Sequence, residues 1–217
     1  ILLAERPDLS TDPESANRLL VAHCPERVLP GKIMEEMAAN DRVIGGLNPL
    51  STDRAKQLYS SFCNGEMLLT NATTAEMAKL TENSFRDVNI AFANELSIIS
   101  DKLGIDVWEL IELANHHPRV NILNPGPGVG GHCIAVDPWF IVSSAQEEAK
   151  LIRTAREVND GKPAYVIAKI TEAVEAEGAD SIAALGIAFK PDIDDLRESP
   201  ALSIVQQMAE KWPEKNI

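Results

Sequence analysis

The stretch TTAEMAKLTENSFRDVNIAFANELSIISDKL, residues 73–103, decides the fold because it contains neither glycine nor proline. Thr73 is followed three residues later by Glu76, which is the pattern of a capping box. Together these features predict one helix of about 30 residues, roughly 45 Å long. At about 100° per residue, one broad apolar stripe collects Met77, Leu80, Phe85, Val88, Ala91, Phe92, Leu96, Ile98, Ile99 and Leu103.

The polar side of this helix gathers Lys79, Asn83 and Arg86 on one face. The apolar stripe is wider than one small domain usually covers, so we predict that part of it packs against a second copy in a homodimer. The alternative is a long helix buried within a single chain.

The residues before the helix alternate between strand and helix patterns. Short apolar runs at 19–23 and 42–46 predict strands, and residues 32–39 and 52–63 have helical spacing. This alternation is typical of an α/β domain.

The residues after the helix are mainly helical in pattern. A second helix is expected from Asp106, with Glu109 as its capping-box partner, to a point before Pro118. Residues 144–160 and 163–177 predict two more helices, separated at Gly161 and Pro163.

The last part of the chain reads as a new βα unit, with a buried strand at 181–189 and a helix at 199–212. The expected fold class is therefore α/β with a central all-α dimerisation domain and partial βα units at both ends. The boundaries fall at 1–70, 71–177 and 178–217.

Composition excludes several classes of protein. A net charge of −13 disfavours binding to nucleic acid or to acidic membrane surfaces. No apolar run is long enough to span a bilayer and no signal peptide is visible, so we expect a cytoplasmic protein. The cysteines at 24, 63 and 133 form no C-x-x-C pair, which argues against a disulfide framework or a zinc site. The first residues read as the end of a helix without an initiator methionine, so we expect a piece of a longer protein.

The segment NPGPGVGGHCIAVDP, residues 124–138, has the residues best suited to chemistry. Its glycines match G-x-G-x-x-G, but no strand precedes them, so the dinucleotide fingerprint fails. The glycines do permit close approach of a ligand beside Cys133, which makes this thiol a candidate nucleophile. A small buried cysteine after a turn is the structural alternative. Asp137 could orient a water or cap a helix, and His116 and His117 lack a third ligand for a metal.

The block GGHCIAVDP, residues 130–138, resembles the Gly-Gly-x-Cys-x-x-x-Asp signature of the nucleotide-sugar 6-dehydrogenases, the UDP-glucose and GDP-mannose dehydrogenase family. Three further blocks resemble that family in the same order, at 23–31, 75–87 and 186–200. The resemblance covers nearly the whole chain.

The resemblance implies an NAD-dependent oxidation of a UDP-sugar alcohol to its acid. Cys133 would form a thiohemiacetal and then a thioester. Lys79 would stabilise the developing oxyanion with Asn83 as its partner, and Glu26 would activate the hydrolytic water.

The resemblance also implies binding residues and domain roles. The diphosphate of the substrate would be contacted by Arg27, Val28, Arg86, His117, Arg119, Phe189 and Lys190, with Gly130 lining the pocket and Arg197 on the cofactor. Residues 1–70 would be the C-terminal part of an NAD-binding Rossmann domain, 71–177 a helical dimerisation domain with the cysteine loop, and 178–217 the start of a UDP-sugar-binding domain.

The glycine-rich turn for the NAD pyrophosphate is missing from the sequence, so we do not expect these residues alone to turn over. Three alternatives remain open. They are a family member acting on an epimeric sugar, a non-catalytic dimerisation module, and a thiol-dependent aldehyde dehydrogenase.

Overall fold

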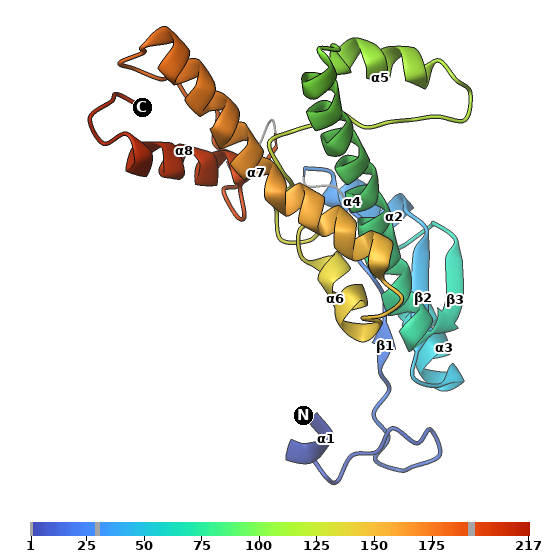
Figure 1. Ribbon diagram of the computed structural model, residues 1–217. Coiled ribbons are helices and arrows are strands. Elements are labelled where there is room, and N and C mark those ends of the chain that lie inside the picture. Colours follow the sequence, from blue (N-terminus) through green and yellow to red (C-terminus); the bar gives the residue numbers. More distant parts are fainter. Residues whose placement is uncertain (1, 29–30, 191–193) are drawn as a thin grey trace. The chain divides into compact units, whose positions relative to one another are not determined.

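The computed structural model describes residues 2–28, 31–190 and 194–217, in two compact units. The first unit is Ile1–Lys79 and the second is Leu80–Ile217. The first contains a small sheet and the second is built from helices (Figure 1). The predicted α/β fold with a helical centre is confirmed. Within the described residues, no helix is both long and apolar enough to cross a membrane.

The sheet of the first unit has the order β1-β2-β3. Its strands are β1 (Ala22–His23), β2 (Arg42–Gly46) and β3 (Met67–Asn71). Its helices are α1 (Leu2–Glu5), α2 (Ile33–Ala39) and α3 (Pro49–Tyr59). β1 is antiparallel to β2, whereas β3 is parallel to β2 and is reached through α3, because a parallel pair needs a crossover connection.

The strand predicted at 42–46 is confirmed, whereas the one predicted at 19–23 is reduced to two residues. The helix α3 begins at Pro49 rather than at residue 52, because the Asn48 side chain accepts a hydrogen bond from the Ser51 amide at 2.8 Å. β3 was not predicted.

Two glycines bring the elements around β2 close together. A Cβ atom added to Gly45 would lie 2.2 Å from the Asn71 carbonyl oxygen, and one added to Gly46 would lie 2.4 Å from the Thr52 nitrogen. Both distances are far below van der Waals contact, so only glycine fits. The carboxyl ends of β2 and β3 therefore meet the start of α3 in one compact edge.

The long helix α4 (Ala72–Leu103) confirms the main prediction from sequence. The predicted capping box is wrong, because Thr73 already lies inside the helix. The Asn71 side chain instead accepts a hydrogen bond from the Thr74 amide at 2.9 Å. An asparagine one position before the helix thus replaces the threonine as the cap.

The buried face of α4 is made of small and polar residues rather than of the large apolar ones. Ser84, Asp87, Ala91, Ala93 and Asn94 are buried. Among the large apolar side chains, Phe85, Phe92 and Ile99 are 72%, 52% and 44% exposed. These three residues repeat every seven positions, so much of the apolar stripe predicted from sequence is exposed to solvent.

Helix α5 (Val107–Asn115) begins as predicted, with the Asp106 side chain accepting hydrogen bonds from the amides of Trp108 and Glu109. Helix α6 (Asp137–Ser144) follows the glycine-rich loop and was not predicted.

Helix α7 (Lys150–Glu177) is continuous, so the prediction of two helices separated at Gly161 and Pro163 is wrong. A proline inside a helix costs about 3 kcal/mol because it removes one backbone hydrogen bond. Here Asn159 and Lys162, on either side of that position, are buried. Burial of this part of the helix against the rest of the unit offsets the cost.

The strand predicted at 181–189 is also wrong. Among the described residues this segment makes one isolated bridge, between Ser181 and Asn216, and Leu185 is 95% exposed. A strand needs a neighbour for its backbone groups, and no described strand pairs with this one. Helix α8 (Pro200–Lys211) is present as predicted, capped by Ser199, and an apolar cluster joins it to α7 through Val174, Ile204, Met208 and Trp212.

Candidate active site

The glycine-rich loop before α6 packs against the segment that leads into α8. A Cβ atom added to Gly130 would lie 2.5 Å from the Phe189 Cβ and 2.6 Å from the Glu198 carbonyl oxygen. The Gly131 amide, in a residue with φ of +83°, donates a hydrogen bond to the Arg197 carbonyl oxygen at 3.1 Å. Glycine is therefore required here both for space and for conformation.

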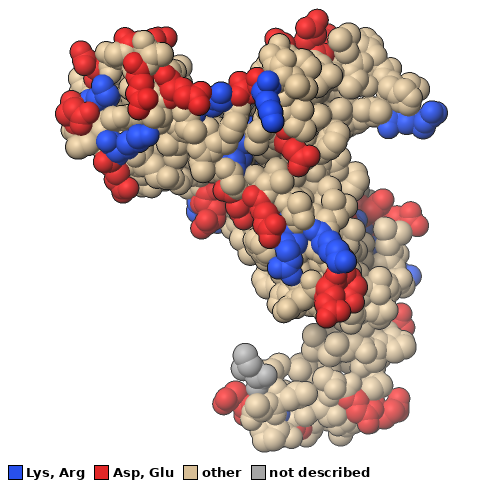
Figure 2. Space-filling view, viewed as in Figure 1, with Lys and Arg blue, Asp and Glu red and all other residues tan. Residues whose placement is uncertain are grey.

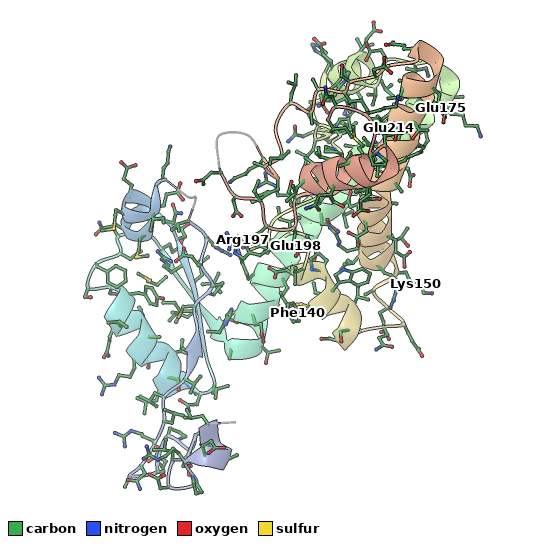
Figure 3. The ribbon with its side chains drawn as sticks, turned by 90° about the vertical axis from the view of Figure 1, so that its left-hand side faces the viewer. Phe140, Lys150, Glu175, Arg197, Glu198 and Glu214 are labelled. Carbon is green, nitrogen blue, oxygen red and sulfur yellow. The ribbon has the colours of Figure 1, made fainter. Side chains whose placement is uncertain are left out.

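The Arg197–Glu198 segment is held in an unusual conformation beside this loop. Glu198 has φ of +49°, which non-glycine residues rarely adopt. The two residues lie next to one another on the chain leading into α8 (Figure 3). Arg197 and Glu198 thus direct consecutive carbonyl oxygens at Gly131 and Gly130.

Cys133 lies just after this loop as a free, half-buried thiol. Its carbonyl oxygen accepts hydrogen bonds from the amides of Val136 and Asp137, at 3.0 and 2.8 Å, and so forms the turn that starts α6. Because Cys133 is only half-buried, it is not enclosed in the core. Cys63, by contrast, is buried, and burial raises the pKa of the Cys24 thiol.

Two predicted catalytic residues meet beside this turn. The Asn83 amide nitrogen, on α4, donates a hydrogen bond of 2.5 Å to the Asp137 carboxylate at the first position of α6. Both side chains are half-buried. Sequence patterns did not predict this pairing, because the two residues are 54 positions apart.

Lys79 and Glu26 lie in the first unit. Lys79 is half-buried on α4, one turn before Asn83. Glu26 is about half exposed, and its carboxylate accepts from the Arg27 amide at 2.6 Å and pairs with the buried Arg42 guanidinium at 3.4 Å. Arg27 and Val28 follow as half-buried residues.

Two predicted phosphate-binding arginines line one cavity of about 640 Å³ in the second unit. Its lining residues are Glu82, Phe85, Arg86, Asn89, Arg119, Asn121 and Leu123. His117 lies beside Arg119, because its Nδ1 accepts a hydrogen bond from the Arg119 amide at 3.3 Å. Two guanidinium groups in one cavity suit a diphosphate.

Phe189 and Lys190 lie elsewhere in the second unit. They line a cavity of about 740 Å³ with Pro127. A Cβ atom added to Gly131 would lie 3.1 Å from the Phe189 ring. The Lys190 ammonium lies 5.9 Å from the centre of that ring. Gly130 packs against Phe189. Arg86 and Arg119 therefore line one cavity, and Phe189 and Lys190 line another.

Arg197, predicted as a cofactor contact, makes an ion pair with Asp195 at 2.5 Å. Its hydrogen bonds to Asp195 raise the pKa of the Arg197 guanidinium.

The sheet edge in the first unit can hold part of a dinucleotide. A cavity of about 370 Å³ lies at the carboxyl ends of β2 and β3, where nucleotides bind in α/β sheets. It is lined by Gly46, Leu47, Asn48, Pro49, Thr52, Asp53, Leu69, Thr70 and Asn71. The chain's residues thus fit one portion of NAD, without the glycine-rich turn for the pyrophosphate.

A buried polar network behind the cysteine loop escaped the sequence analysis. Asp87 and Asn94 on α4 meet Arg156 and Asn159 on α7, and all four are at most 1% exposed. Burial raises the pKa of the Asp87 carboxyl, against the opposing effect of Arg156. A signal for this network was present in the sequence. Asp87 and Asn94 are polar residues seven positions apart in a helix that was otherwise expected to bury apolar groups.

Comparisons with known proteins identify the family of the chain. Three models of the UDP-glucose/GDP-mannose dehydrogenase family match in order: the NAD binding domain at residues 5–63, the central domain at 73–161 and the UDP binding domain at 183–215.

Relatives and solved structures cover nearly all of the chain. It is 61% identical to UDP-N-acetyl-D-mannosamine dehydrogenase of Campylobacter jejuni, over 96% of the chain and 52% of that protein. It is 59% identical to NDP-N-acetyl-D-galactosaminuronic acid dehydrogenase of Ralstonia nicotianae, over 97% of the chain and 50% of that protein. A solved UDP-D-ManNAc dehydrogenase from Pyrococcus horikoshii has a TM-score of 0.82 at 47% identity, covering 91% of this chain and 48% of that one.

The chain therefore spans about half the length of the curated relatives it matches. The three family models lie in their family order and include the cysteine loop and the Asn83–Asp137 pair. The chain belongs to the UDP-glucose/GDP-mannose dehydrogenase family.

Proposed function

We propose that this chain is part of an NAD-dependent enzyme that oxidises UDP-N-acetyl-D-mannosamine to UDP-N-acetyl-D-mannosaminuronic acid. The observation that supports this most is the Asn83–Asp137 hydrogen bond of 2.5 Å at the turn formed by Cys133. It brings an amide and a carboxylate to the helix start that follows a half-buried thiol. Such a group of residues is suited to covalent catalysis on a carbonyl carbon.

Cys133 is the nucleophile in this mechanism. After the C6 alcohol of the sugar has been oxidised to the aldehyde, the Cys133 sulfur adds to the carbonyl carbon and a thiohemiacetal forms. Oxidation of this adduct gives a thioester, and water then replaces the sulfur to release the acid and the free thiol. Overall, one alcohol, one water and two NAD⁺ give one carboxylic acid, two NADH and two protons.

Four polar side chains are assigned to the remaining chemistry. The Asp137 carboxylate, oriented by Asn83, accepts a proton from a water or from the substrate hydroxyl. Lys79 stabilises negative charge on the substrate oxygen, and Glu26 assists attack by the hydrolytic water. NAD supplies the acceptor for both two-electron oxidations.

The substrate diphosphate is bound by cationic side chains. Arg86 and Arg119 line one cavity beside His117, which supports their assignment to the phosphates. Arg27, Val28, Gly130, Phe189 and Lys190 complete the proposed binding set, with Arg197 on the cofactor side.

The sugar specificity rests on sequence blocks, because CPERVLPG at 24–31 and HPRVN at 117–121 resemble those of UDP-N-acetyl-D-mannosamine dehydrogenases. The first alternative is UDP-N-acetyl-D-glucosamine, which differs only at C2. The full-length enzyme should be assayed with NAD⁺ and each epimer. We expect about two NADH per acid with the manno sugar, and a preference for the gluco sugar would reverse the assignment.

A non-catalytic dimerisation module is the second alternative. Cys133→Ser in the full-length enzyme separates the two functions, since the proposed mechanism predicts loss of acid production and the module predicts no change.

A thiol-dependent aldehyde dehydrogenase would oxidise the 6-aldehyde but not the alcohol, so supplying both substrates to the unmodified enzyme tests that function.

The enzyme acts as a homodimer in this proposal. Phe85, Phe92 and Ile99 repeat every seven residues on α4 and are 72%, 52% and 44% exposed, which suits a helix from a second copy. Sedimentation analysis of the protein and of Phe92→Glu tests this, with a shift to monomer expected in the variant. A monomeric unmodified protein would contradict it.

The 217 residues by themselves are not expected to turn over. Their sequence lacks the glycine-rich turn that would hold the NAD pyrophosphate. We assign the enzyme to the cytoplasm, where NAD and nucleotide sugars are available. Measurement of NADH formation by this chain, with substrate at saturating concentration, should give no signal above background.

A further inference from the structure

Asn94, in the C-terminal half of α4, contacts Gly126, the first glycine of the cysteine loop. Its side chain is fully buried. The Oδ1 atom accepts a hydrogen bond from the Gly126 amide at 2.8 Å, and the Nδ2 atom donates one to the Asn159 Oδ1 at 2.8 Å. Both ends of the amide are therefore engaged, and exchange of its oxygen and nitrogen would set donor against donor at Gly126.

The network behind Asn94 fixes the direction of the Asn159 amide. The Asn159 Nδ2 donates to the Asp87 carboxylate at 2.8 Å and to the Asp87 carbonyl oxygen at 3.1 Å. The Arg156 Nη1 donates to the same carboxylate oxygen, Asp87 Oδ1, at 2.6 Å. Because these groups are buried, loss of a partner is costly and the arrangement has little freedom to change.

The other end of the loop is held independently. The Gly131 amide binds the Arg197 carbonyl oxygen, and Gly130 packs on Phe189. Cys133 follows two residues later and its carbonyl begins the turn into α6. The backbone between Gly126 and Gly131 is thus restrained at both ends, and the end at Gly126 depends on a side chain of the same helix that presents Asn83.

We propose that Asn94 is a positioning residue for Cys133, which rests on the proposed function of that thiol. Through Gly126, Asn94 holds the N-terminal end of the loop so that the Cys133 sulfur keeps a fixed direction relative to the Asn83–Asp137 pair. Asn94 itself does not touch the substrate. Asp87, Arg156 and Asn159 act only by fixing the orientation of Asn94.

The first test measures thiol reactivity in this chain. Iodoacetamide labelling of Cys133 is followed by peptide mass spectrometry, with Cys24 in the first unit as the reference within each sample. In Asn94→Ala, release of the loop should raise the Cys133-to-Cys24 rate ratio several-fold. The control is Val174→Ala, which truncates a buried side chain between α7 and α8 away from the loop; its ratio should stay at the parent value.

Conservative variants make the test specific to the Gly126 contact. Asn94→Asp keeps an oxygen towards Gly126 and should give a smaller rise than Asn94→Ala. The serine side chain of Asn94→Ser is too short to accept the hydrogen bond from the Gly126 amide. This variant replaces Asn94→Ala in the test if Asn94→Ala does not fold. Equal ratios in parent, Asn94→Ala (or Asn94→Ser) and Val174→Ala would overturn the assignment.

The second test measures turnover in the full-length enzyme. Because a misplacement of about 1 Å at a reacting group can cost about 100-fold in rate, we expect Asn94→Ala to lower kcat by about 10- to 100-fold and to leave the KM for the nucleotide sugar nearly unchanged. Faster alkylation combined with slower turnover is the diagnostic result. If Cys133→Ser retained acid production, the proposed function would fail, whereas the labelling ratio would still report on the loop.

Discussion

Replacement of Gly130 by alanine tests the contact between the cysteine loop and the segment before α8. The added Cβ would lie 2.5 Å from the Phe189 Cβ and 2.6 Å from the Glu198 carbonyl oxygen. Carbon atoms normally approach to about 3.5–4.0 Å, so one side of the contact must move by about 1 Å. Overpacking of this kind costs about 1–3 kcal/mol in the free energy of unfolding.

Gly126→Ala is the matched control in the same loop. Its added Cβ meets one atom, the Gly128 carbonyl oxygen, at 3.9 Å, and its amide still reaches Asn94. We expect its free energy of unfolding to change by no more than about 0.5 kcal/mol. Urea denaturation followed by circular dichroism measures both variants. Equal midpoints for Gly130→Ala and Gly126→Ala would refute the packing argument, because the structure gives them very different surroundings.

Three further predictions follow from the site. In the full-length enzyme, Asn83→Ala and Asp137→Ala should each lower kcat. Because the two residues share one hydrogen bond, the double variant should lose less activation free energy than the sum of the two single losses. Additive losses would mean that the residues act independently. Arg86→Ala should weaken UDP binding about tenfold or more, because a charge-assisted hydrogen bond is lost. Arg153 lies outside the cavity lined by Arg86 and Arg119, so Arg153→Ala should leave UDP binding unchanged. Isothermal titration calorimetry measures both affinities. Arg197 lowers the pKa of Asp195 from 3.8 to about 2, so the pair stabilises the fold fully above about pH 4 and loses this contribution as the pH falls towards 2. Asp195→Asn should therefore flatten the dependence of stability on pH in that window, and an unchanged curve would contradict the assignment.

Local sequence patterns predicted the elements whose cause is local. The helix α4 follows from about 30 residues without a helix breaker, and the cap at Asp106 follows from its own short side chain. The start of α4 was misplaced because Asn71 and Thr73 both have suitable oxygen acceptors. Which of the two caps the helix depends on where β3 ends, and β3 itself was not visible in the sequence.

Features that depend on tertiary contacts could not be predicted in this way. Pro163 predicts a helix boundary, yet α7 continues through it because Asn159 and Lys162 are buried against neighbouring elements. The run 181–189 has the composition of a buried strand but has no described strand beside it. The candidate site shows the same division, since the motif pointed to Cys133 from sequence alone, whereas the hydrogen bond between Asn94 and Gly126 depends on the packing of the helices.

The contact of Gly130 and Gly131 with Phe189 and the Arg197–Glu198 backbone has a consequence for protein engineering. Residues some 60 positions apart along the chain must fit one another to within a fraction of an ångström. A chimaera that exchanges the C-terminal portion between two dehydrogenases to alter nucleotide selectivity would break this fit if its junction fell between α7 and α8. Junctions placed upstream of residue 124 would transfer both surfaces together and keep the donor's own match.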